Sequence, residues 1–190
     1  MENTEFVDVE TPQEKKRFYS SWLETAILIA ILCAALALRT TGLMWGENKY
    51  LHPDERFLVW VTADIQPIDS FGQYFDTAKS TLNPVNTGHG FYVYGTWPVL
   101  LTHFLANALQ PGTGWEDYLA VGRAIATGFD LLAVFLAYLI AERLFNRKVG
   151  LLAAAFSAFA VMQIQQSHFY TVDSFATGFV TLAVYFAVRL

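Results

Sequence analysis

Long apolar runs separated by short polar stretches dominate the hydrophobic pattern of the chain. The first run, 22–44, is long enough to form a helix that crosses the hydrocarbon core of a bilayer, which needs ~20 residues. Three further runs follow much later, and we place them at 118–144, 149–165 and 174–190. The pattern predicts an all-α polytopic membrane protein with about four transmembrane helices. A polar tail over residues 1–21 precedes the first of them.

The stretch 45–117 does not follow this alternation and is predicted to form a loop on one side of the membrane. Apolar residues recur at helical spacing over 53–66, which predicts an amphipathic juxtamembrane helix lying at the interface. The segment 91–109 is apolar, but it is marginal in length and contains Gly95 and Pro98. We therefore interpret this segment as interfacial or re-entrant.

Basic residues set the expected orientation of the chain. Lysine and arginine fill positions 15–17 just before the first span, and three more lie in the loop 142–148 between the second and third spans. Because short cytoplasmic loops are enriched in these residues, we place both groups, and with them the N-terminus, in the cytoplasm. The loop 45–117 then lies outside, provided that 91–109 does not cross the membrane.

Composition narrows the class of protein further. Hydrophobic residues make up 54% and aromatic residues 16% of the 190 positions, which is too apolar for a soluble domain of this size. The 12 basic and 17 acidic residues give a net charge of −5, which argues against nucleic acid as a partner. Cys33 is the only cysteine, so neither an internal disulfide nor a cysteine metal site is expected.

Acidic residues at two places close to the membrane are the candidate functional residues. Asp54 and Glu55 follow Pro53 at the predicted start of the juxtamembrane helix, and Asp173 lies at the start of the last span. Carboxylates are favoured in the first turn of any helix, so these residues can be simple helix starts. Charge beside a membrane is costly and tends to be functional, and this second interpretation stays open beside the first.

Four stretches carry a family resemblance through their order and spacing. They are ALALRTTGL, HPDERF, GRAIATGFDLLAVFLAYLIAERLFNRKVGLLAAAFSAF and QQSHFYTVDSFATGF. Together they resemble the N-terminal half of the polytopic GT-C glycosyltransferases, in the branch of the protein O-mannosyltransferases and aminoarabinose transferases. The resemblance covers most of 22–190. It implies an enzyme of the bacterial plasma membrane that moves a sugar from a polyprenyl-phosphate carrier to an acceptor at the outer face.

The resemblance also implies roles for individual residues. Asp54 would act as the base or orient the acceptor hydroxyl, with Glu55 and Asp173 supporting it. The same three carboxylates are candidate ligands for a divalent metal cation as cofactor. Arg39 and Arg123 would pair with these acids or with lipid phosphate, although either arginine can instead snorkel to the interface. Candidate substrate-binding residues of second rank are His52, His168 and Tyr170.

Two features depart from the family pattern. Family members have more spans and a soluble C-terminal region, so we expect this chain to be the N-terminal part of a longer enzyme. Asp130 lies inside the second span, where a carboxylate should find a partner on a neighbouring helix or another chain. The alternative function is therefore a non-catalytic membrane subunit that uses the same module to pack in a larger complex. Membrane lipid, a polyprenyl-phosphate sugar and other membrane subunits are the expected partners.

The topology can be tested by labelling introduced single cysteines from either side of the membrane. We expect a cysteine at Arg147 to react only from the cytoplasm, and cysteines at Ser70 and Gln166 only from outside. Labelling of positions 70 and 166 from opposite sides would contradict a shared acidic site.

Overall fold

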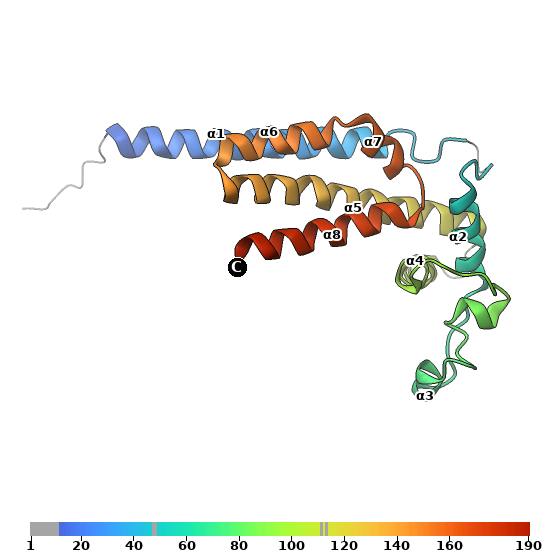
Figure 1. Cartoon of the computed structure of the whole chain (residues 1–190). Helices are drawn as coiled ribbons and strands as arrows, with labels where there is room; N and C mark the ends of the chain where they lie inside the picture. Colours follow the sequence, from blue (N-terminus) through green and yellow to red (C-terminus); the bar gives the residue numbers. More distant parts are fainter. Residues whose placement is uncertain (1–11, 47–48, 111, 113) are drawn as a thin grey trace, which may run out of the picture.

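The regular structure of the chain is helical. The computed structural model describes residues 12–46, 49–110, 112 and 114–190, and every regular element within these residues is a helix (Figure 1). The all-α class predicted from the hydrophobic pattern is therefore confirmed. Of the predicted tail, residues 1–11 lie outside the described residues, and the first helix already begins at Pro12.

The helices form a bundle and a layer across one of its ends. The bundle contains α1 (Pro12–Thr40), α5 (Trp115–Leu144), α6 (Arg147–Ala158), α7 (Val161–Ser167) and α8 (Val172–Arg189). The other elements are α2 (Pro53–Asp64), α3 (Phe71–Phe75), the 3-10 helix η1 (Pro84–Thr87) and α4 (Thr96–Leu109). In Figure 1, α1, α5, α6 and α8 run along the bundle, whereas α2 and α4 lie across it. We call the end that α2 covers the α2 end.

Three of the bundle helices are long and apolar enough to cross a membrane. They are the Ser21–Thr40 part of α1, all of α5, and α8. The pair α6 and α7 provides a fourth span if it is counted as one, with a bend of 59° between the two helices. The chain is thus a multi-pass membrane protein. By contrast, the 14 residues of α4 extend only about 21 Å, which is less than the ~30 Å hydrocarbon core.

The ends of several elements differ from the predicted ranges. The first span is predicted to reach residue 44, but its helix ends at Thr40 and the chain continues in turns. The juxtamembrane helix predicted over 53–66 ends at Asp64, because residue 66 precedes Pro67 and the helical conformation is disfavoured there. Within the predicted segment 91–109, only the part from residue 96 is helical. These shifts leave the order of the elements unchanged.

The predicted third span, 149–165, is split into α6 and α7. The fully buried guanidinium of Arg39 donates to the carbonyl oxygens of Ala158 (2.9 Å) and Ser157 (3.3 Å) at the end of α6. Its Nε donates to the carboxylate of Asp130 on α5. A helix end leaves carbonyl groups without partners, and hydrocarbon supplies no donors for them. Arg39 therefore accounts for the break, and it is the partner that Asp130 was expected to need.

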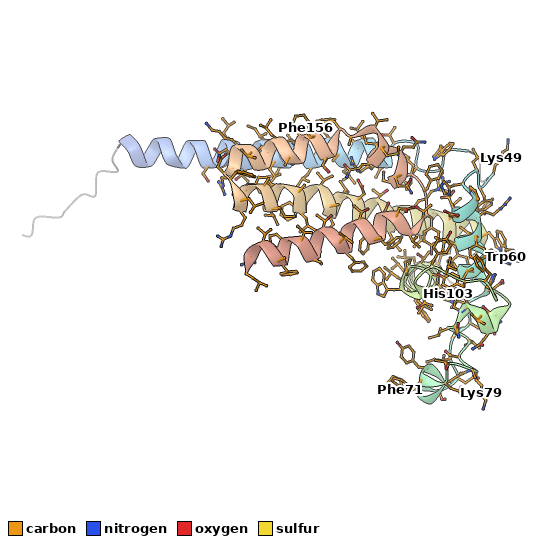
Figure 2. The ribbon with its side chains drawn as sticks, in the orientation of Figure 1. Lys49, Trp60, Phe71, Lys79, His103 and Phe156 are labelled. Atoms are coloured by element: carbon orange, nitrogen blue, oxygen red, sulfur yellow. The ribbon has the colours of Figure 1, made fainter. Side chains whose placement is uncertain are left out.

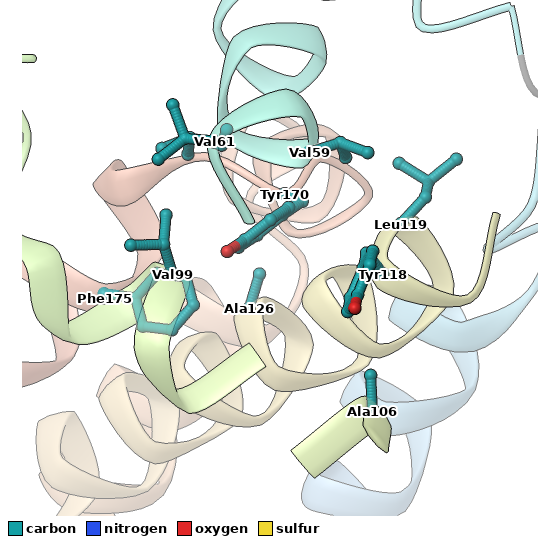
Figure 3. Packing of buried hydrophobic residues seen from close by; sticks show 10 residues of the cluster. Val59, Val61, Val99, Ala106, Tyr118, Leu119, Ala126, Tyr170 and Phe175 are labelled. Carbon is teal, nitrogen blue, oxygen red and sulfur yellow. The ribbon is translucent and has the colours of Figure 1, made fainter. Parts of the chain in front are cut away.

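A compact apolar core joins α2, α4 and α5 at the α2 end. Figure 3 shows the ring of Tyr170, from the linker between α7 and α8, close to Val59 on α2, Val99 on α4 and Ala126 on α5. These four residues have no exposed surface. Gly122 on α5 permits this packing, because a Cβ atom there would lie 2.4 Å from Cγ of the Tyr170 ring.

This contact predicts that Gly122→Ala destabilises the fold. The added methyl group overlaps the Tyr170 ring, and overpacking of this kind costs about 1–3 kcal/mol. Gly128→Ala on the same helix is the matched control, because a Cβ atom there would meet no atom within 4 Å. Thermal unfolding in detergent should show a lower midpoint for Gly122→Ala alone. Equal midpoints for the two variants would contradict the packing described.

Candidate functional site

The centre of the site is a buried ion pair between α2 and α5. Arg123 donates from Nε to Oε1 of Glu55 and from Nη2 to Oε2, and both distances are 2.7 Å. The side chain of Glu55 has no exposed surface, and that of Arg123 is 3% exposed. This is the two-bond geometry in which a guanidinium and a carboxylate interact most strongly. Of the two adjacent acids at the start of α2, Glu55 therefore faces the protein interior.

The same pair fixes two stretches of irregular backbone. The backbone N–H of Tyr170 donates to Oε1 of Glu55 at 2.7 Å. On the other side, Nη1 of Arg123 donates to the carbonyl oxygens of Leu43 (2.7 Å) and Trp45 (3.3 Å). Glu55 and Arg123 thus connect α2, α5, the segment after α1 and the linker before α8. Both residues are best understood as holding the α2 end together.

Asp54 has a different environment from its neighbour. It lies in the first turn of α2, and its side chain is only partly buried. His52 caps this helix, because its Nδ1 accepts the backbone N–H of Asp54 at 3.2 Å. The imidazole ring of His52 also contacts the ring of Phe169, with 4.9 Å between the centroids. His52, one of the predicted substrate-binding residues, therefore positions the turn that carries Asp54.

Asp173 also begins a helix at the α2 end. It lies in the first turn of α8 and is exposed. The side-chain amide of Gln166 donates to Oδ2 of Asp173 at 2.9 Å and to the hydroxyl of Thr171 at 2.7 Å. Because Tyr170, three residues earlier, is bound by Glu55, the start of α8 is held beside the start of α2. The acids at 54 and 173 therefore share one end of the bundle.

Tyr94 lies near both of these carboxylates. Its ring contacts that of Phe57, with 6.2 Å between the centroids. Partial burial, the neighbouring carboxylate of Asp54 and the negative charge of Asp173 all raise the pKa of the Tyr94 phenol. A neutral phenol between two carboxylates can donate a hydrogen bond to either of them or to a bound hydroxyl group.

The remaining predicted binding residues lie elsewhere. Arg39 is fully buried beside Asp130, away from the acidic pair. Tyr170 is also fully buried, and burial raises the pKa of its phenol to about 12. His168 is partly exposed and contacts the carbonyl oxygens of Ile164 (Nδ1, 2.7 Å) and Thr41 (Nε2, 3.0 Å). Of the two arginines, only Arg123 pairs with one of the candidate acids.

The three predicted acids do not form a metal site in this arrangement. Both carboxylate oxygens of Glu55 already accept hydrogen bonds from Arg123. Within the part of the chain that the structure describes, no three His, Cys, Asp or Glu side chains are grouped so that they could hold a metal ion. A metal ion bound by all three acids would require Glu55 to release Arg123.

Two residues of the site were not singled out from the sequence. Tyr94 is one of several aromatic residues in FYVYG, where its spacing gives no special signal. Gln166 precedes Asp173 by seven positions, within a polar stretch at the predicted end of the third span. Its position in that stretch was the only sequence feature that pointed to the site. The hydrogen bonds of its amide depend on how the linker folds.

Comparison of the chain with family models, curated proteins and solved structures gives no match. The geometry of the site and the resemblance of the sequence motifs are therefore the basis for assigning a function to the chain.

The two adjacent acids should respond differently to loss of charge. Glu55→Gln leaves the buried guanidinium of Arg123 without a counter-charge, and breaking such a pair costs about 3–5 kcal/mol. Asp54→Asn should cost much less, because Asp54 is only partly buried and no buried charge pairs with it in the part of the chain that the structure describes. The midpoints of thermal unfolding in detergent give the loss of stability for both variants. If Glu55→Gln unfolds at the temperature of Asp54→Asn, the structural role given to Glu55 is wrong.

Proposed function

We propose that the chain is the N-terminal part of a membrane glycosyltransferase that moves a sugar from a polyprenyl-phosphate carrier to an acceptor hydroxyl. The reaction takes place at the α2 end, which we assign to the outer face of a bacterial plasma membrane, with the N-terminus in the cytoplasm. The support for this proposal is the GT-C-like motif order together with the arrangement of the acids. Other parts of the complete enzyme would supply most of the carrier-lipid site.

The observation that carries the proposal is the contrast between Asp54 and Glu55. Glu55 is neutralised inside the protein by Arg123, whereas Asp54 is partly exposed and faces Tyr94. If both acids were buried and paired, no carboxylate would be left for a substrate. The division instead leaves one carboxylate, held by a rigid neighbour, beside the membrane surface. Preorganisation of this kind is what a positioned general base requires.

The proposed reaction is a single displacement at the anomeric carbon of the sugar. The acceptor oxygen forms a bond to this carbon while the bond from the carbon to the carrier phosphate oxygen breaks. The carrier leaves as polyprenyl phosphate with the bonding electrons. The hydroxyl proton of the acceptor passes to the carboxylate of Asp54, which lowers the barrier to attack. The configuration at the anomeric carbon is inverted.

The neighbouring residues support this step. Tyr94 lies near the Asp54 carboxylate, and its phenol can donate a hydrogen bond to this carboxylate or to a bound hydroxyl group. Asp173, fixed by Gln166, lies near the same phenol and can orient the sugar or the acceptor through hydrogen bonds. Arg123 acts indirectly by fixing Glu55 and with it the first turn of α2. We give no step to a metal ion, because the three acids do not fit one in this arrangement.

The second candidate is a non-catalytic subunit built on the same module. The observation in its favour is that Arg39, Glu55, Arg123 and Tyr170, four of the predicted site residues, are buried and have structural partners. In that case the acids of the α2 end serve only to start helices. The two functions differ in what the charge of Asp54 does.

Substitution of Asp54 tests the proposal directly. We expect Asp54→Asn in the full-length protein to reduce sugar transfer by at least the ~10²-fold that general-base catalysis contributes. Transfer is measured as incorporation of a labelled sugar from its polyprenyl-phosphate carrier in membrane vesicles. The thermal midpoint and membrane insertion should remain close to those of the unsubstituted protein.

Asp64→Asn is the matched control on the same helix. Asp64 lies at the last turn of α2, where it pairs with Nε2 of His89 at 2.9 Å and is partly exposed. Its loss should change transfer only slightly, because Asp64 lies at the opposite end of α2 from Asp54. Full transfer by Asp54→Asn would reject the catalytic role and favour the structural subunit.

A further inference from the structure

The short helix α3 carries an unusual cluster of exposed aromatic residues. Phe71 is 77%, Tyr74 52% and Phe75 68% exposed, although all three are large and apolar. They contact one another, with ring centroids 5.3 Å apart for Phe71 and Phe75 and 5.0 Å for Tyr74 and Phe75. We call these three residues the aromatic tip. They form one continuous apolar surface.

Hydrogen bonds hold the aromatic tip in place on its loop. The side chain of Gln73 accepts the backbone N–H of Asp69 at 2.8 Å and donates to the carbonyl oxygen of Lys79 at 3.2 Å. The amide of Asn86 donates to the carbonyl oxygens of Thr77 (2.9 Å) and Ser80 (3.0 Å). The loop is therefore folded around α3, and the aromatic residues project from it although none of them is needed to fill a core.

The position of α3 places the aromatic tip at a membrane boundary. In Figure 1, α3 lies to the side of the bundle at the same level as α4, just past the ends of α1 and α8 at the α2 end. Those helix ends mark where two of the spans leave the hydrocarbon core. Aromatic side chains concentrate at this level in membrane proteins, because their rings are amphipathic and the interface is in contact with both hydrocarbon and water. The exposed Trp97 on α4 lies in the same layer.

The apolar and the charged side chains of the loop lie on opposite sides, as insertion into a membrane surface requires. Figure 2 shows Phe71 on the side of α3 that faces along the bundle toward its other end, and Lys79 on the opposite side. The side chain of Lys79 is 80% exposed and lies 3.8 Å from the carboxylate of Asp76. The apolar side of the loop thus faces the bilayer, and a charged pair lies on the side away from it.

We propose that the aromatic tip inserts into the boundary between headgroups and acyl chains of the phospholipid bilayer, beside the bundle. The helices α4 and α8 also expose large apolar side chains, such as Trp97 and Phe179, at the α2 end, where the lipid around the spans would cover them. Insertion there would anchor the loop 65–95, which leads from α2 to α4, at a fixed depth. The proposal concerns lipid binding alone and does not depend on the catalytic role of Asp54.

Depth measurement by spin labelling tests this proposal. A nitroxide is attached to single cysteines at positions 71, 75 and 79 in a Cys33→Ala background, and the full chain is placed in phosphatidylcholine–phosphatidylglycerol nanodiscs. Collision rates with oxygen, which concentrates in lipid, are compared with those of a polar nickel chelate, which stays in water. We expect the oxygen-to-nickel ratio to be several-fold higher at 71 and 75 than at 79. The label at 79 is the matched control on the same loop.

Two other outcomes would overturn the proposal, and they differ from each other. High nickel collision rates at 71 and 75 would show that the tip projects into water. Low collision rates with both reagents would show that it is covered by protein, either another part of a longer chain or a separate subunit. A double variant, Phe71→Ser with Phe75→Ser, should keep the thermal midpoint in detergent. In nanodiscs of the same lipids, it should lower the oxygen-to-nickel ratio of a label at 74.

Discussion

The ion pair between Glu55 and Arg123 is the constraint on which the α2 end depends. Taking two charges out of water is expensive, and the attraction between them repays the cost only if the remaining hydrogen-bonding groups are also satisfied. Here the carboxylate also accepts the N–H of Tyr170, and the guanidinium also donates to the carbonyl oxygens of Leu43 and Trp45. The pair therefore specifies one arrangement of four chain segments, and any other arrangement would leave a buried charge unpaired.

A second buried arginine solves a related problem further along the bundle. Arg39 pairs with Asp130 and donates to the carbonyl oxygens at the end of α6, as Arg123 does for the carbonyl oxygens after α1. The carbonyl groups at the end of α6 are the last of a helix within the membrane, where water cannot satisfy them, whereas Leu43 and Trp45 lie in the turns after α1. The planar guanidinium has five donors, so it can bind a carboxylate and carbonyl oxygens together. Lysine could keep the charge in either place but could not reproduce this geometry.

Sequence reasoning identified what depends on local pattern and missed what depends on long-range contacts. Hydrophobic runs located the spans, and the helix start at Pro53 followed from its first-turn acids. The need of Asp130 for a partner was predictable from the cost of a charge in the membrane. The identity of this partner, Arg39, was not predictable, because the two residues are 91 positions apart. The break between α6 and α7 was missed for the same reason, since the donor that stabilises it comes from α1.

The division of roles between Asp54 and Glu55 follows from helix geometry. Successive residues on a helix point about 100° apart, so Asp54 and Glu55 in the first turn of α2 have different surroundings. Packing of α2 on α5 directs Glu55 inward to Arg123, and Asp54 is thereby directed toward Tyr94 and the start of α8. A shift of one residue in this helix start would bury Asp54 and expose Glu55. The cap at His52 and the ring of Pro53 fix that register, so they control which carboxylate reaches the membrane surface.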